Sequence, residues 1–110
     1  MRLKQKVVIQ NDDRTLKEVL GEEITIKDFP LTLIVHESLE GWEIGKLKVS
    51  EKGTGCGMFT VKSKKLQDVK QKDIEEELNH FLEIHPLEDI LESLKQFPTV
   101  KQLQERLQNA

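Results

Sequence analysis

Alternating apolar and polar positions dominate the middle of the chain. The segments 31–39, 41–49 and 57–61 show this period of two and are separated by turn residues, a pattern typical of antiparallel strands. Pro30 stands at the start of the first segment, where a residue without a backbone N–H is tolerated. We therefore expect three antiparallel strands at the centre of the fold.

The segment 41–49 changes phase along its length. Trp42 and Ile44 share one parity. Leu47 and Val49 share the other, so a regular strand could not point all four at one core. One extra residue at positions 45 and 46 would restore them to one face, which predicts a β-bulge; a strand with two half-buried faces is the alternative. We expect the Trp42 indole to be buried between sheet and helices.

The turn at 51–57 contains three glycines at alternate positions. Their spacing matches neither GxGxxG nor GxxxxGK[ST], so it does not predict a phosphate-binding loop. A flexible hairpin loop is the expected structure. The alternative is a backbone surface that approaches a ligand or partner closely, for which glycine is suited.

The first thirty residues carry weaker signals. Segments 5–10 and 23–27 contain β-branched residues in strand-like order, and they predict two further strands. Between them, Thr15 and Glu18 have the spacing of a capping box, and Gly21 stands where a helix-terminating glycine would. These residues predict a single helical turn over 16–20.

A helical period replaces the alternation after residue 62. One or two helical turns are expected within 63–72, and Asp73 with Glu76 indicates the N-terminus of a longer helix. Pro86 suits the first turn of a second helix, and Thr99 with Gln102 has capping-box spacing for a third. The apolar stripes are Ile74, Leu78, Phe81 and Leu82, then Leu87, Ile90, Leu91, Leu94 and Phe97, then Val100, Leu103 and Leu107.

Strands followed by helices indicate an α+β protein. With 110 residues, the chain is expected to form a single domain, strand-rich over 1–62 and helical over 63–110. We predict an antiparallel sheet of four to five strands followed by two or three C-terminal helices packed on one face. One of the three apolar stripes is expected to remain available for a second chain, which predicts a homodimer or a partner interface.

Composition excludes several classes of protein. The single cysteine allows no internal disulfide and no multi-cysteine metal site. The sequence has no apolar run of about 18 residues and no signal-peptide core, which predicts a cytoplasmic protein without a membrane contact. A net charge of −3 argues against a generally basic nucleic-acid binder.

Four residues are candidates for chemistry. Glu77 and His80 have a Glu-x-x-His spacing found in metal bundles, but no second copy accompanies them, so a solvated helix face is expected. Cys56 is a candidate nucleophile if backbone amides lower its pKa. It would need a base from elsewhere, and a free thiol of ordinary reactivity is expected. His85, before Pro86, is expected near a helix N-cap. We expect no catalytic residue, metal or cofactor.

Charge is strongly segregated along the chain. Eight lysines against two acidic residues give segment 46–72 a charge of +6, whereas eight acidic residues and no lysine or arginine give 73–92 a charge of −8. Solvated faces, an acidic surface for a partner and a nucleic-acid contact all remain open. The candidate partner residues are Asp73, Glu76, Glu83, Glu88, Val100, Leu103 and Leu107, and the candidate nucleic-acid contacts are Lys46, Lys48, Lys52, Lys62, Lys64 and Lys65.

A further pattern consists of Gly41, Trp42 and Ile44, followed by Thr54, Gly55 and the lysine-rich segment. In these residues the chain resembles small uncharacterised proteins of phages and integrated mobile elements of low-GC Gram-positive bacteria. The resemblance implies an accessory protein of such an element and carries no catalytic residues. We therefore predict a small non-enzymatic protein-interaction module. The alternative is a nucleic-acid-associated protein that uses the lysine-rich hairpin 46–72, and the third possibility is an enzyme that uses Cys56.

Overall fold

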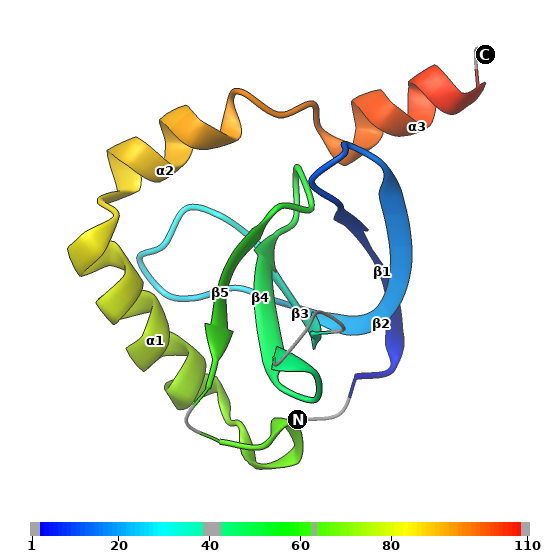
Figure 1. The fold of residues 1–110 in the computed structure, drawn as a ribbon. Helices are drawn as coiled ribbons and strands as arrows, with labels where there is room; N and C mark the ends of the chain where they lie inside the picture. Colours follow the sequence, from blue (N-terminus) through cyan, green and yellow to red (C-terminus); the bar gives the residue numbers. More distant parts are fainter. Residues whose placement is uncertain (1–2, 39–42, 63, 109–110) are drawn as a thin grey trace.

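A computed structural model describes residues 3–38, 43–62 and 64–108. Within them, the chain forms a five-stranded antiparallel sheet in the order β1-β2-β3-β4-β5, followed by three helices (Figure 1), which confirms the predicted α+β class. The elements are β1 (Gln5–Gln10), β2 (Leu16–Ile24), β3 (Leu33–Glu37), β4 (Leu47–Glu51), β5 (Gly57–Val61), the short 3-10 helix η2 (Leu66–Asp68), α1 (Gln71–Ile84), α2 (Leu87–Leu94) and α3 (Val100–Gln108).

The main apolar core lies on one face of the sheet. Val35 of β3 pairs with Val49 of β4, and both are fully buried on the same face because side chains alternate along a strand. α1 covers this face beside β5 (Figure 1) and contributes Ile74 and Leu78. The buried cluster comprises Ile24, Ile26, Leu33, Val35, Leu47, Val49, Val61, Val69, Ile74 and Leu78.

The end of β1 meets the turn between β4 and β5. The Gln10 backbone N–H donates to the Gly55 carbonyl at 2.9 Å. Gly55 has a φ of +74°, and a Cβ on it would lie 2.7 Å from the Gln10 nitrogen, so this close approach requires glycine. The β1–β2 hairpin thereby partly encloses the second face of β3, which carries Ile34 and His36.

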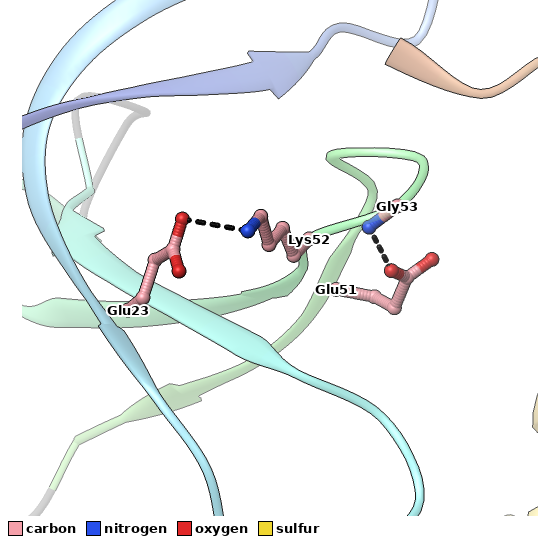
Figure 2. Close-up of polar contacts among 4 residues, drawn as sticks. All are labelled: Glu23, Glu51, Lys52 and Gly53. Atoms are coloured by element: carbon pink, nitrogen blue, oxygen red, sulfur yellow. Dashed lines mark hydrogen bonds and ion pairs between the residues drawn. The ribbon is translucent and has the colours of Figure 1, made fainter. Parts of the chain in front are cut away.

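The β4–β5 turn is tied down by a buried carboxylate. Glu51 accepts hydrogen bonds from the Gly53 N–H (Figure 2) and from the N–H and hydroxyl of Thr54. The Gln10 side-chain amide donates to the Thr54 carbonyl at 2.7 Å and to the Pro98 carbonyl at 2.9 Å. The predicted hairpin is confirmed, because this turn joins the paired antiparallel strands β4 and β5. The bonds described above also join the turn to β1 and to the segment before α3.

The predicted helical turn over 16–20 is wrong. These residues belong to β2, where Val19 pairs with Val7 of β1. Thr15 caps no helix, since its N–H and hydroxyl both donate to the Asp13 carboxylate in the β1–β2 turn. Arg14 has a φ of 64° in that turn. The strand predicted over 23–27 coincides with β2 only through Ile24, because β2 ends there.

The strand predicted over 41–49 begins only at Leu47. No bulge occupies positions 45 and 46: Gly45 lies in a turn with a φ of +86° and donates its N–H to the Ser38 carbonyl at 3.3 Å. A register shift occurs instead between Val49 and Ser50, opposite β5. Trp42, which we expected to be buried, lies outside the described residues.

Two of the predicted helix starts need correction, whereas the third is confirmed. Asp73 is the third residue of α1 and accepts the Lys70 N–H at 2.8 Å, so it is not the N-cap. His85 caps the C-terminus of α1, and the N-cap of α2 is Pro86. Thr99 and Gln102 form the reciprocal capping box before α3, with distances of 3.0 and 3.1 Å. Within 63–72, the described residues form one short 3-10 turn, η2, and α1 begins at Gln71.

Candidate functional site

A pocket of about 240 Å³ lies between α2, the end of α1 and the strand ends near residues 10–12 and 56–58. The apolar stripe of α2 forms one wall because its period brings Ile90 and Leu94 to the inner side; Ile90 is 7% exposed. The other apolar residues that line the pocket are Met58, Phe81 and Phe97.

Two exposed carboxylates line this pocket, and the Arg14 guanidinium lies 5.9 Å from the ring centroid of the lining residue Phe97. Asp12 follows β1 and Asp89 lies in the first turn of α2; both line the pocket and are exposed. Glu88 and Glu92 are exposed on the same helix. An apolar interior behind carboxylates suits a ligand that has an apolar group and a positive charge.

Two apolar side chains close in sequence to the pocket-lining residues are exposed. Ile84 at the end of α1 is 75% exposed, and Leu91 on α2 is 37% exposed. Both are close in sequence to the pocket-lining residues His85 and Ile90. Exposed apolar residues beside an apolar pocket with a charged rim are typical of a surface that binds another molecule.

Cys56 and His85 line the same pocket, together with Asp89. Burial raises the pKa of the Cys56 thiol above its ordinary value and outweighs the opposing hydrogen bond with Thr54. The His85 ring lies 4.7 Å from the Phe81 ring, centroid to centroid. Among the described residues, no hydrogen bond joins the Cys56 sulfur to the His85 ring, whereas an activated thiol nucleophile is ordinarily paired with a base.

The Gln10 side chain braces the wall beside β1. It is 8% exposed, and its amide nitrogen donates to the two carbonyls that hold the β4–β5 turn against the segment before α3. Its Oε1 atom is buried and has no hydrogen-bond partner. An unpaired buried acceptor is costly in a folded protein and invites an explanation in terms of a ligand or water.

The predicted acidic and apolar partner residues have different surroundings. Asp73 is buried, and its Oδ1 lies 3.1 Å from Lys64 Nζ, so this carboxylate pairs within the chain. Leu103 is also buried, whereas Leu107 is 71% exposed near the end of α3. Val100 donates its N–H to the Gly53 carbonyl at 2.9 Å. Three acidic candidates are exposed, namely Glu76, Glu83 and Glu88, and only the last belongs to α2.

The predicted nucleic-acid lysines occur at both ends of the β4–β5 hairpin. Lys52 is in the turn between the strands and lies 2.9 Å from Glu23 (Figure 2). At the opposite end, Lys62 lies 3.4 Å from Glu43, and Lys64 is paired with Asp73. Lys65 is exposed, while Lys46 and Lys48 are half-buried. Ion pairing therefore reduces the positive field of three of the six candidates.

The described residues contain no group of three or more His, Cys, Asp or Glu that could hold a metal ion. Within the same residues, Glu77 is half-buried and His80 is exposed on α1. None of the described helices is both long and apolar enough to cross a membrane.

Sequence reasoning did not identify the pocket, because its walls come from distant segments. The i, i+4 spacing of Phe81 and His85 was visible in the sequence, but nothing near Gln10 or Asp12 indicated that they would face α2. Comparison with family models, curated protein sequences and solved structures found no match to this chain.

Proposed function

We propose that this protein is a non-enzymatic interaction module that binds a segment of a partner protein at the α2 pocket. The partner inserts an apolar side chain between α2 and the sheet, and lysine or arginine residues beside it pair with the acidic rim. The observation that carries the proposal is the pocket with apolar walls and with Asp12 and Asp89 at its opening.

Charge complementarity selects the partner. The segment 73–92, which includes the end of α1 and most of α2, has eight acidic residues and no lysine or arginine. A field of one sign attracts a basic partner and speeds its encounter. Apolar contact inside the pocket then supplies the part of the affinity that salt does not screen.

The size of the pocket favours a side chain over a cofactor. Pockets for drug-sized molecules usually measure about 300–1,000 Å³, whereas this one measures about 240 Å³. It therefore suits one large side chain or two small ones from a peptide. The protonated state that burial favours for the Cys56 thiol supports binding in preference to covalent chemistry.

An accessory role in a phage or integrated mobile element, which the resemblance implies, belongs to this proposal. Such a role requires a partner from the element or its host, and the pocket supplies a surface of suitable chemistry. The nucleic-acid alternative is less favoured because Lys52, Lys62 and Lys64 have acidic partners within the chain.

A test uses fluorescent nine-residue peptides with a central Leu, Phe or Trp flanked by lysine and arginine. Fluorescence anisotropy is expected to show saturable binding that weakens as salt rises. Asp89→Lys reverses the charge of one carboxylate that lines the pocket. Ser93 also lines the pocket, so Ser93→Trp places an indole inside it. Each substitution is expected to weaken binding at least tenfold, because one removes attraction and the other removes space.

Glu105→Lys is the matched control, since Glu105 is exposed on α3 and the substitution changes net charge equally. It should bind the peptides as the wild type does, with circular dichroism confirming the fold of each variant. The proposal is overturned if no basic–apolar peptide binds, or if Asp89→Lys and Ser93→Trp bind as tightly as the control.

Self-association is a second candidate, and the exposure of Leu107 favours it. This side chain is 71% exposed at the end of α3, where the helix projects beyond β1 (Figure 1). A second copy of the chain could bury the Leu107 side chain, and homodimers ordinarily have two-fold symmetry. Sedimentation equilibrium at micromolar concentration should show a dimer that Leu107→Ser disrupts, and a monomer at all concentrations would refute it.

A further inference from the structure

Strand β5 forms one edge of the sheet, because the strand order of the described residues ends with it (Figure 1). An edge strand directs half of its backbone N–H and C=O groups away from the sheet, where they can pair with a further strand. β5 has five residues, which at about 3.3 Å per residue gives an edge of roughly 16 Å. This edge is long enough for a segment of about five residues from another chain.

The hydrogen bonds around β4 show which of its backbone groups face which neighbour. Directly after β4, the Lys52 N–H donates to the Thr32 carbonyl beside β3 at 3.0 Å. The Glu51 N–H donates to the Cys56 carbonyl beside β5 at 2.9 Å. Because these groups alternate along an antiparallel strand, even-numbered residues of β4 bond to β3 and odd-numbered residues bond to β5.

This alternation leaves the Thr60 backbone facing outward. Leu47 of β4 pairs with Val61, and its neighbour two residues on, Val49, pairs with Phe59. Both β4 residues are odd-numbered, so Phe59 and Val61 exchange their backbone hydrogen bonds with β4. The register shift of this pair of strands lies beyond Val49 and does not affect these positions. Thr60 therefore directs its N–H and carbonyl away from the sheet, and within the described residues neither group has a hydrogen-bond partner.

A cavity of about 470 Å³, the edge cavity, lies against this side of β5. Phe59 and Thr60 both line it, although their side chains point to opposite faces of the strand. The Phe59 ring lies 5.5 Å from the Phe81 ring of α1, centroid to centroid. The Thr60 hydroxyl donates to the Glu43 carboxylate at 3.2 Å. A cavity lined from both faces of an edge strand reaches round its free edge, so the outward backbone groups of Thr60 border open space.

The edge cavity adjoins the α2 pocket, since Gly57 and Met58 line both. Gly57 is exposed and Met58 is half-buried. The two spaces thus follow consecutive residues of β5, from Gly57 to Thr60, and one extended chain can occupy both.

The two spaces differ in charge. The edge cavity is lined by two carboxylates and two ammonium groups, those of Glu43, Glu77, Lys48 and Lys62. By contrast, the charged residues that line the α2 pocket are both acidic, Asp12 and Asp89. Basic residues of a bound segment are therefore expected at its α2 end, beside the apolar side chain that enters the pocket.

We propose that the partner segment binds in an extended conformation along β5 and adds a strand to the sheet. Its backbone accepts from the Thr60 N–H and donates to the Thr60 carbonyl, while its apolar side chain enters the α2 pocket. Main-chain hydrogen bonds supply affinity in such strand addition, and side-chain pockets supply specificity. This inference rests on the proposed function and adds the conformation of the partner.

The first test methylates single backbone nitrogens along the tightest-binding basic–apolar peptide. A strand directs alternate N–H groups to its neighbour, so methylation at every second position should weaken binding at least tenfold, whereas methylation at the positions between should have little effect. If the peptide binds but methylation shows no alternation, strand addition is overturned and the proposed function stands. If no basic–apolar peptide binds, both are overturned.

Substitution of Thr60 tests the same contact from the protein. Thr60→Pro removes the outward N–H without removing a bond to β4, and proline is tolerated at such edge positions. Thr60→Val is the matched control, because both substitutions remove the hydroxyl that donates to Glu43 but only proline removes the N–H. The proline variant should bind the peptide at least tenfold more weakly than the valine variant, with circular dichroism confirming both folds. Equal affinity of the two folded variants would overturn the inference.

Hydrogen exchange of the wild-type chain provides a readout that needs no variant. The Thr60 amide should exchange rapidly in the free protein, whereas the amides of Phe59 and Val61 should be protected by β4. Saturation with the peptide should then protect the Thr60 amide as well. Continued rapid exchange of Thr60 in the saturated complex would contradict strand addition.

Discussion

Replacement of Glu51 tests how the β4–β5 turn is held. Its carboxylate is 7% exposed and accepts from the Gly53 N–H and from two donors of Thr54. The same turn accepts hydrogen bonds from Gln10 and from the Val100 N–H of α3. Glu51→Ala should therefore destabilise the whole domain and loosen the wall of the α2 pocket next to Gln10 and Cys56.

The magnitude follows from the donors that lose their acceptor. Gly53 is exposed, so water can replace the carboxylate there at little cost. Thr54 is 4% exposed, and each of its two donors left unpaired costs about 1–3 kcal/mol. Relief of the desolvation of Glu51 itself offsets part of this cost. We expect Glu51→Ala to lower the free energy of unfolding by about 3 kcal/mol, a large share of the roughly 5–15 kcal/mol typical of a domain.

Urea unfolding at pH 7, followed by circular dichroism, measures this loss. Both Thr54 donors bond to Glu51 Oε1, so Glu51→Gln, which retains an acceptor oxygen there, should lose much less stability than Glu51→Ala. Hydrogen exchange provides a local readout, since the amides of Gln10 and Val100 both bond to the turn and should exchange faster in the alanine variant.

Glu23→Ala is the matched control for this experiment. Glu23 forms an ion pair with Lys52 in the same turn (Figure 2), but about half of each side chain is exposed. Such a pair contributes about 0–1 kcal/mol, so its loss should be small. If Glu51→Ala changes stability no more than Glu23→Ala does, the buried carboxylate does not organise the turn and our reasoning is refuted.

Two further predictions concern titration. Because burial raises the pKa of the Cys56 thiol, a thiol reagent at pH 7 should react more slowly with the folded protein than with the chain unfolded in urea. This rate is below the ordinary thiol rate that the sequence predicted. A faster reaction in the folded protein would contradict the prediction. The pKa of Asp73 is lowered, first by the hydrogen bond from the Lys70 N–H and second by the Lys64 side chain. The stability that the ionised Asp73 carboxylate contributes is therefore complete above the ordinary carboxyl pKa and is lost as pH falls through the lowered value. The urea midpoints of wild type and Asp73→Asn should therefore differ at pH 7 and converge in acid, and a constant difference would refute the assignment.

Much of the order of elements could be predicted from the sequence. Local periods of two and 3.6 residues are set by backbone geometry, so consecutive residues such as 57–61 and 87–94 reveal their structure directly. The capping box of Thr99 and Gln102 was equally readable, because both partners lie within one helical turn. The candidate site was predicted only in its chemistry, as an acidic helical region near apolar stripes.

Other features were decided by contacts between distant segments. The 16–20 segment has the local signs of a helix start, yet it is a strand because β1 pairs with it. β3 pairs with the continuation of β2 from Gly21 to Ile24. Gly55 meets the end of β1, 45 residues away in sequence, and this contact converts an apparently flexible loop into a fixed junction. The α2 pocket exists only where such segments converge.

The sequence by itself therefore determined the α+β order, the helical stripes and the segregation of charge, because each depends on neighbouring residues. Only the tertiary structure decided that Cys56, His85 and Asp89 line one pocket and that the Gln10 side chain joins the β4–β5 turn to the segment before α3. Burial and pairing of a polar group depend on what packs against it from remote parts of the chain, and a local pattern contains no record of that packing.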